Sequence, residues 1–235
     1  MTIESNYTIA VCTRDVGNNN ICRFMTSYQK IMDPQGFELM VMSTGRGQFE
    51  NLNMAIEASR TKYFICADDD LEFNELQIGL VDKLDKFWNA QENALGIAAG
   101  PNVKTPTICD ESIFSCYNNF FMCCLNRNAL EEIKKITGNY FDETYKYSQC
   151  GDVDLIRTGR YLGKHWFCAD FMCPHHHISQ SKGEFYENYL KKNQEYMRAK
   201  WGCETDALPE IENNWSSFEE WLEMKDDTNC MEKFL

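Results

Sequence analysis

The sequence predicts an α/β protein built on a mostly parallel central sheet, and three observations support this. Short apolar runs recur in the first half of the chain, which is typical of strands buried on both faces. Segments with apolar residues at helical spacing lie between these runs. The resulting β-α-β-α-β order falls within roughly the first seventy residues. Such an order predicts parallel strands with helices on both faces of the sheet.

The first half of the chain is expected to contain four strands and three helices. Aromatic and β-branched residues mark the strands, and the helices carry apolar residues every three or four positions. The expected strands are Tyr7–Cys12, Phe37–Met42, Tyr63–Cys66 and Leu95–Gly100, and the expected helices are about Asn20–Met32, Leu52–Ser59 and Asn74–Trp88.

The second half has a different character. Residues 113–125 hold Asn118-Asn119 between two aromatic and cysteine-rich runs, which indicates a pair of antiparallel strands or one long bent strand. Gly138 and Gly163 are expected to end two helices. The expected helices are Asn128–Ile136, Asp152–Leu162, Gly183–Trp201 and Ser217–Met224, and the last expected strand is Trp166–Cys173.

Three aspartates, Asp68, Asp69 and Asp70, directly follow the central strand. In an open α/β sheet, ligands bind at the carboxyl ends of the strands. Three adjacent carboxylates repel one another, and a divalent cation such as Mg²⁺ or Mn²⁺ would hold them together and bind a substrate's phosphates. The alternative is that Asp70 caps the next helix and the other two are solvated.

The net charge of −13 argues against a nucleic-acid partner or an anionic membrane. An acidic protein that binds a phosphorylated ligand needs a metal to offset repulsion, which agrees with the acidic triplet. Residues 203–235 carry ten acids and two lysines, so we expect an acidic C-terminal extension. Its helix is expected to pack on the domain through Phe218, Trp221 and Leu222.

The twelve cysteines do not indicate disulfides or a zinc site. Cys66 and Cys123-Cys124 lie inside apolar runs, as small buried hydrophobic residues do, and no C-x-x-C pair is present. The N-terminus lacks the pattern of a signal peptide, and no apolar run approaches membrane-spanning length. We therefore expect a cytoplasmic protein without membrane insertion.

Several motifs, in this order, resemble a family 2-type glycosyltransferase with the GT-A fold. The likeness covers about Tyr7–Gly202 and implies a single domain over residues 1–202, with a nucleotide-binding half at about 1–100 and an acceptor half at 101–202. The motifs are the strand ending in Thr13-Arg14-Asp15, N-L-N-M-A-I-E (51–57), the strand entering D-D-D, F-F-M-C-C-L-N-R-N-A-L-E-E-I (120–133), F-D-E-T-Y (141–145), G-D-V-D-L (151–155), H-H-H-I-S-Q-S (175–181) and M-R-A-K-W-G (197–202).

The resemblance implies transfer of a sugar from a nucleoside-diphosphate sugar to a hydroxyl of a glycan or another acceptor, with inversion. Asp68-x-Asp70 matches the family's metal-binding motif. Asp70 would bind the Mn²⁺ or Mg²⁺ that bridges the donor's diphosphate, and Asp68 would contact the ribose or the metal. Asp69 lies between them in the donor site.

A histidine beyond the last strand completes the metal site in many relatives, and imidazole suits Mn²⁺ better than Mg²⁺. In an extended segment His175 and His177 share one face, and His176 points away. The resemblance therefore implies His177, or else His175, as a metal ligand. A plain surface cluster of histidines is the alternative.

Asp152 falls where the family places its general base, which takes the proton from the acceptor hydroxyl. The dipole of the expected helix would favour the ionised form of this side chain. The alternative is that Asp152 only caps the helix. The family commonly has Glu-Asp here, and Gly151 replaces the glutamate, which leaves Asp154 as a rival base.

For the nucleoside, the resemblance implies contacts from Thr13, Arg14 and Asp15, with Asn51 or Asn53 from the following helix. Relatives often carry an acidic residue at the end of the second strand to hold the base, but here Ser43-Thr44 stands at that point. A UDP-sugar is favoured over GDP- or dTDP-sugars by the family alone.

Other functional classes have weaker support. A sugar-phosphate nucleotidyltransferase would need a G-x-G-x-R loop after the first strand, and residues 13–20 contain only Gly17. A dehalogenase-like phosphatase places D-x-D after its first strand, whereas here the acids follow the third. A catalytically inactive sugar-nucleotide-binding module would be consistent with Gly151.

Overall fold

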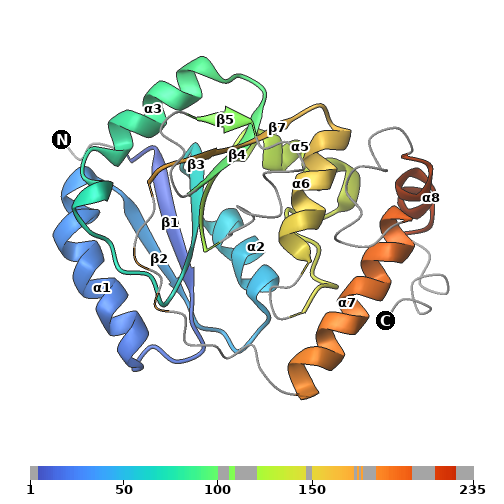
Figure 1. Cartoon of the computed structure of the whole chain (residues 1–235), viewed down its shortest axis with the longest axis horizontal. Helices are drawn as coiled ribbons and strands as arrows, with labels where there is room; N and C mark the ends of the chain where they lie inside the picture. Colours follow the sequence, from blue (N-terminus) through green and yellow to red (C-terminus); the bar gives the residue numbers. More distant parts are fainter. Residues whose placement is uncertain are drawn as a thin grey trace.

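One mixed sheet of seven strands runs through the part of the chain that the computed structural model describes (Figure 1). The described residues are 5–99, 106–108, 121–146, 150–171, 174, 176, 184–202 and 215–225. The strands are β1 (Tyr7–Cys12), β2 (Glu38–Met42), β3 (Tyr63–Asp68), β4 (Ala94–Ala99), β5 (Thr107–Ile108), β6 (Met122–Asn126) and β7 (His165–Ala169), in the order β2-β1-β3-β6-β4-β7-β5.

Helices cover both faces of the sheet, as the sequence predicts (Figure 1). One face packs against α1 (Asn19–Ile31) and α3 (Leu80–Ala90). The other face carries α2 (Gln48–Ala58), α5 (Arg127–Thr137), α6 (Gly151–Tyr161), α7 (Glu184–Trp201) and α8 (Ser216–Met224), and two short 3-10 helices, η1 (Asp33–Gln35) and η2 (Glu75–Gln77), lie in connections.

The strand directions confirm a mostly parallel sheet. β1 pairs in parallel with β2 and β3, and β4 pairs in parallel with β7. β6 lies antiparallel between β3 and β4, and β5 is antiparallel to β7. The antiparallel part expected in the second half is therefore built into the same sheet. Of the predicted segment 113–125, the residues before 121 lie outside the described part of the chain.

Two predicted elements differ from the structure. The helix expected over Asn74–Trp88 is divided into η2 and α3, because Gly79 adopts a left-handed φ of 73° that a continuing α-helix excludes. The Asn74 side chain caps η2 by accepting the Leu76 amide at 2.9 Å, so Asp70 is not the cap of this turn. β7 ends at Ala169, earlier than expected.

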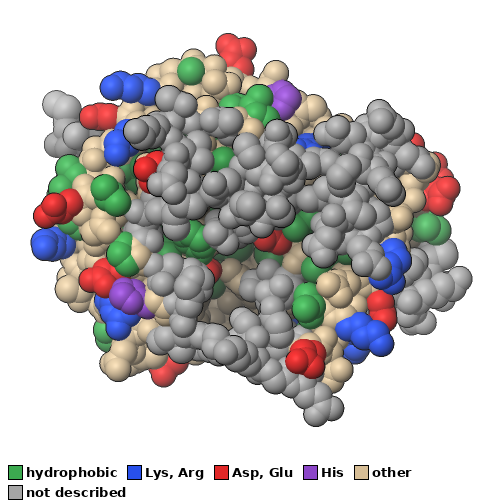
Figure 2. All heavy atoms as spheres, viewed as in Figure 1, with side chains coloured by type: hydrophobic (Ala, Val, Ile, Leu, Met, Phe, Trp, Pro, Cys, Tyr) green, Lys and Arg blue, Asp and Glu red, His purple; other side chains and the backbone are tan. Residues whose placement is uncertain are grey.

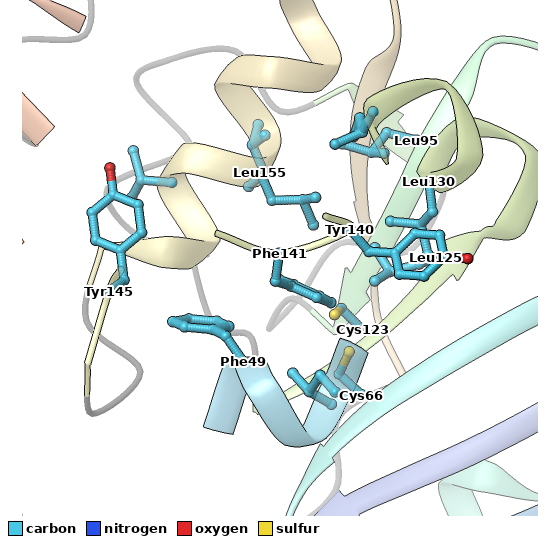
Figure 3. Packing of buried hydrophobic residues seen from close by; sticks show 14 of the residues in the cluster. Phe49, Cys66, Leu95, Cys123, Leu125, Leu130, Tyr140, Phe141, Tyr145 and Leu155 are labelled. Atoms are coloured by element: carbon cyan, nitrogen blue, oxygen red, sulfur yellow. The ribbon is translucent and has the colours of Figure 1, made fainter. Parts of the chain in front are cut away.

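Two hydrophobic clusters fill the space on either side of the sheet. Cys66 and Cys123 are directly opposite each other on β3 and β6 and belong to the cluster shown in Figure 3. Cys124 points into the other cluster, and all three are buried, as expected. The cysteines that the structure describes are free thiols. Among the described helices, none combines the length and apolar character needed to cross a bilayer.

The tail helix α8 packs on the domain through the predicted residues. The Phe218 ring stacks on Trp201 of α7, with centroids 4.1 Å apart and an interplanar angle of 9°. Phe218 and Trp221 are buried, and Leu222 packs against the same cluster. This expectation is confirmed for α8, while the division of the chain at residue 202 stays a prediction.

The two halves of the chain meet where the first turn of α6 lies on Phe49 of α2. A Cβ atom at position 151 would lie 2.3 Å from two carbon atoms of the Phe49 ring, closer than any real contact. The same ring stacks on Phe141 at a centroid distance of 5.5 Å (Figure 3). Glycine at 151 therefore permits this close approach of α6 to the Phe49 ring.

Gly151→Ala should lower the free energy of unfolding by about 1–3 kcal/mol, because the added methyl group overpacks the contact with Phe49. Urea denaturation would measure this loss, with the exposed Gly17→Ala expected to stay within about 0.5 kcal/mol of the parent. In a Phe49→Ala background the cost of Gly151→Ala should fall by at least about 1 kcal/mol. The same cost in both backgrounds would refute the packing explanation.

Candidate functional site

The loops that follow β1, β2 and β3 lie at one edge of the sheet, because these neighbouring strands are parallel. The Thr13 amide donates to the Met42 carbonyl at 2.9 Å, and Cys12 is paired with Asp68 across the strands. The structure thus brings Thr13 and Asp68 to adjacent strand ends, as predicted from the order of elements. Arg14 and Asp15 follow Thr13 and are exposed.

The acidic triplet stands at the end of β3. Asp68, Asp69 and Asp70 are all half-buried, and the Asp68 amide donates to the Phe121 carbonyl at 2.9 Å. The triplet is therefore fixed by the sheet at its first residue and opens toward the carboxyl edge. The space-filling view shows that the face turned toward the viewer is hollowed near its middle, with acidic and hydrophobic side chains beside the hollow (Figure 2).

The chain that follows β7 runs beside the acidic triplet. The Glu72 amide donates to the Pro174 carbonyl at 2.9 Å, and the His176 amide donates to the Asp70 carbonyl at 3.0 Å. The Nε2 atom of the His176 ring lies 2.7 Å from the carboxylate of Glu72. Two backbone hydrogen bonds and one side-chain pair therefore join the histidine segment to the aspartate segment.

The donor atoms at this point fit a hard divalent metal in part. Asp68 and Asp70 offer carboxylate oxygens, while His175 and His177 lie outside the described residues. Within the described residues, no group of three or more His, Cys, Asp or Glu side chains forms a complete metal site. One or two carboxylates together with substrate phosphates are a usual way for proteins to hold Mg²⁺, so the present donor set suits a metal that arrives with a phosphorylated ligand.

Asp152 is the second residue of α6, whose N-terminus lies at the carboxyl edge because the helix leads back into β7. The residue before the helix, Cys150, adopts a left-handed φ of 70°, which is rare outside glycine. The Asp152 carboxylate is half-buried and accepts the Val153 amide at 2.9 Å. Its role as the helix N-cap is excluded, since Cys150 holds that position.

Burial raises the pKa of the Asp152 carboxyl to about 6, although the amides of Val153 and of Asp152 itself act to lower it. The dipole of α6 was expected to favour ionisation, but the loss of hydration outweighs it. The Asp152 carboxyl group is consequently a weaker acid than that of an ordinary aspartate, and it is still mostly ionised at neutral pH.

A short chain of contacts connects Asp152 with the strand ends. The Cys12 Sγ atom lies 3.9 Å from the Gln48 carbonyl oxygen at the start of α2. Phe49, the next residue, packs on Gly151 directly before Asp152. The first turn of α6 therefore adjoins the edge that carries the acidic triplet.

Asp154 is turned toward the protein interior, unlike Asp152. Its carboxylate accepts hydrogen bonds from Trp201 Nε1 at 2.7 Å, Lys200 Nζ at 3.0 Å and the Tyr145 hydroxyl at 3.2 Å. Burial raises the pKa of Asp154, and the Lys200 ammonium opposes this effect. A carboxylate surrounded by three internal donors is not placed to meet an acceptor hydroxyl.

Asn51 and Asn53, the amides expected near the nucleoside, are buried and bonded within the protein. Asn53 Nδ2 donates to the Phe141 carbonyl at 2.9 Å, and its Oδ1 accepts the Phe141 amide at 2.8 Å. Asn51 Oδ1 accepts the Thr44 hydroxyl at 2.5 Å. Both side chains therefore hold loops of this chain in place.

Sequence reasoning missed three residues around Asp152, namely Phe49, Cys150 and Lys200. Gly151 in place of an expected glutamate was the signal for a close neighbour such as Phe49. Lys200 stands inside the M-R-A-K-W-G motif, yet a lysine is ordinarily exposed and nothing local indicates its burial.

Comparisons with known proteins agree with the described fold. Residues 6–91 match the family model for glycosyl transferase family 2. Comparison with curated protein sequences gave no match.

Solved structures with the same fold include the mannosyltransferase PcManGT from Pyrobaculum calidifontis in complex with GDP-Man and Mn²⁺, at a TM-score of 0.56 and 13% identity, covering 92% of this chain and 69% of that one. A Drosophila β-1,4-galactosyltransferase 7 mutant in complex with manganese, UDP-Gal and xylobiose is similar at a TM-score of 0.52 and 11% identity, covering 79% of both chains. S. aureus TarS in complex with UDP-GlcNAc is similar at a TM-score of 0.50 and 13% identity, covering 97% and 75%.

These likenesses establish the fold. The chain thus has the GT-A fold of these structures, and its residues 6–91 match glycosyl transferase family 2.

Proposed function

We propose that the enzyme moves a sugar from a nucleoside-diphosphate sugar, with a UDP-sugar favoured, to an acceptor hydroxyl with inversion at the anomeric carbon. This proposal rests on one observation: the acidic triplet and the carboxylate of Asp152 lie at the same edge of the sheet. The acidic triplet ends β3, and the half-buried Asp152 begins α6 beside it. Residues 1–202 would form the catalytic domain and 203–235 an extension of it.

The donor would bind to the loops after β1 and β3. Thr13, Arg14 and Asp15 would contact the nucleoside, with Asp69 beside it. The likeness to structures that hold manganese with a nucleotide sugar supports a divalent metal here.

Asp70 and Asp68 would hold Mn²⁺, or else Mg²⁺, with His177 or His175 completing the set. The metal, when bound, would act as a Lewis acid that stabilises charge on the leaving diphosphate. The backbone pairing of Asp70 with His176 supports this set, because it brings the histidine segment to the aspartate segment.

Asp152 would take the proton from the acceptor hydroxyl. A pKa of about 6 leaves the carboxylate mostly ionised at pH 7 and keeps it a better base than an ordinary aspartate. Asp154, the rival, is occupied by internal donors. A base on the face opposite the leaving group permits one in-line displacement, which inverts the anomeric carbon.

The chief alternative is a catalytically inactive sugar-nucleotide-binding module. Its support was the glycine at position 151, where the resembled family commonly has glutamate. The contact of Gly151 with Phe49 gives that glycine a packing reason, so the departure no longer argues for lost catalysis. A sugar-phosphate nucleotidyltransferase has no further support.

Asp70→Asn should weaken Mn²⁺-dependent binding of UDP by at least about tenfold, or about 1.4 kcal/mol, because the amide is a poorer ligand for a hard cation. Isothermal titration with UDP, in the presence of Mn²⁺ and then of EDTA, measures this. The exposed Asp82→Asn on α3 serves as the control and should bind as the parent does. Equal affinity for Asp70→Asn and the parent would remove the metal role from Asp70.

Turnover should fall as the pH drops through about 6, since protonation of Asp152 removes the base. Asp152→Asn should lower kcat by about 10² to 10⁴ with donor affinity retained, and should lack this acid limb. Initial rates of UDP release from pH 5 to 8 test both points. An acid limb that survives in Asp152→Asn would assign the base to another group.

The stability of this variant provides an independent check. The folded-state pKa of Asp152 is raised above the ordinary aspartate value, so its ionisation costs stability as the pH rises through about 6. In urea denaturation, the free energy of unfolding of Asp152→Asn relative to the parent should therefore be higher at pH 8 than at pH 5.

A further inference from the structure

Lys200, in the last turn of α7, has a side chain that is 0% exposed. Its Nζ atom lies 2.8 Å from the Asp142 carboxylate and 3.0 Å from the Asp154 carboxylate. The Trp221 ring of α8 covers the ammonium group, with its centroid 3.9 Å from Nζ. Burial alone would lower the pKa of Lys200, but the two carboxylates raise it, so the group is charged.

Both carboxylates are held by further donors. Asp142 accepts the Tyr196 hydroxyl and the Thr144 amide, at 2.8 and 3.0 Å. Burial alone would raise the pKa of Asp142, but the Lys200 ammonium lowers it below the ordinary value. An ion network of this kind is a poor source of net stability, since apolar residues of similar volume often stabilise as well or better. A role in fixing geometry is therefore the better explanation for this network than a gain in stability.

The network binds the same first turn of α6 that contacts Phe49. The Asp154 amide closes that turn by donating to the Cys150 carbonyl at 2.9 Å, and its carboxylate binds Lys200 and Trp201. Gly151 packs on Phe49 of α2. The backbone that carries Asp152 is therefore held by contacts to both α2 and α7.

We propose that Lys200 is a positioning residue, which sets the Asp152 carboxylate for catalysis by fixing the first turn of α6 through Asp154. This inference rests on the proposed function, in which Asp152 is the base. A shift of about 1 Å in a catalytic group can cost about a hundredfold in rate. The proposed donor residues lie on the loops after β1 and β3, so donor binding does not depend on Lys200.

The test compares Lys200→Met, Lys200→Arg and the control Lys191→Met, an exposed lysine on the same helix. The readouts are kcat for hydrolysis of UDP-glucose, UDP-GlcNAc or GDP-mannose, whichever the parent turns over, and the Kd of the matching nucleoside diphosphate with Mn²⁺. Lys200→Met should lower kcat per folded molecule by at least about tenfold, with Kd within about threefold of the parent. Lys200→Arg, which keeps the charge and both partners, should recover most of the loss, and Lys191→Met should match the parent.

A Lys200→Met protein with parental kcat would overturn the proposal. So would one in which kcat falls and Kd rises by more than about threefold, without rescue by arginine. If Lys200→Met does not fold, Trp201→Phe decides, because it removes only the indole donor to Asp154 and keeps an aromatic ring on Phe218. Unchanged kcat in Trp201→Phe would then refute the positioning role.

Hydrogen exchange separates this inference from the proposed function. The amides of residues 151–154 should exchange at least about tenfold faster in Lys200→Met, or in Trp201→Phe if it takes its place, than in the parent and in Lys191→Met. If the parent turns over no donor, the proposed function fails, and the exchange rates alone decide whether Lys200 holds the turn. Unchanged exchange would show that it does not.

Discussion

The contact between Gly151 and Phe49 joins α6, which carries the candidate base Asp152, to α2, which follows the loop after β2. Because no Cβ atom separates them, the first turn of α6 sits against α2, and the Phe49 ring also stacks on Phe141. Asp152, the next residue, is half-buried there, and Asp154 in the same turn faces inward. A side chain at 151 would force the Phe49 ring or α6 to shift.

Burial acts on three nearby carboxyl groups with different results, because their partners differ. Among the described residues, the hydrogen bonds to Asp152 come from backbone amides, and burial raises its pKa to about 6. Asp142 is equally subject to burial, but Lys200 lowers its pKa below the ordinary value. Asp154 shares the same lysine and has three internal donors. The environment thus separates the candidate base, which the resemblance favoured over Asp154, from two structural carboxylates.

Local sequence patterns predicted the helices and strands, and most features that the sequence did not predict depend on contacts between distant parts of the chain. The apolar runs of β1 and β3 and the acids after β3 were readable, since strand periodicity and the order of elements are local signals. The place of β6 between β3 and β4 depends on pairing with strands that are distant in sequence. The break between η2 and α3 depends on the backbone angle of a single residue, Gly79. The raised pKa of Asp152 and the buried Lys200 arise from tertiary packing that no spacing reveals.

The central claim is that Asp152 acts as a base on the face of the sugar opposite the leaving diphosphate. Proton NMR of the first-formed sugar, recorded before the anomers equilibrate, tests it most directly and needs no knowledge of the natural acceptor. With an α-linked donor such as UDP-glucose and water as the acceptor, the account predicts the β-anomer as the first product. An α-anomer formed first would contradict the assignment of Asp152.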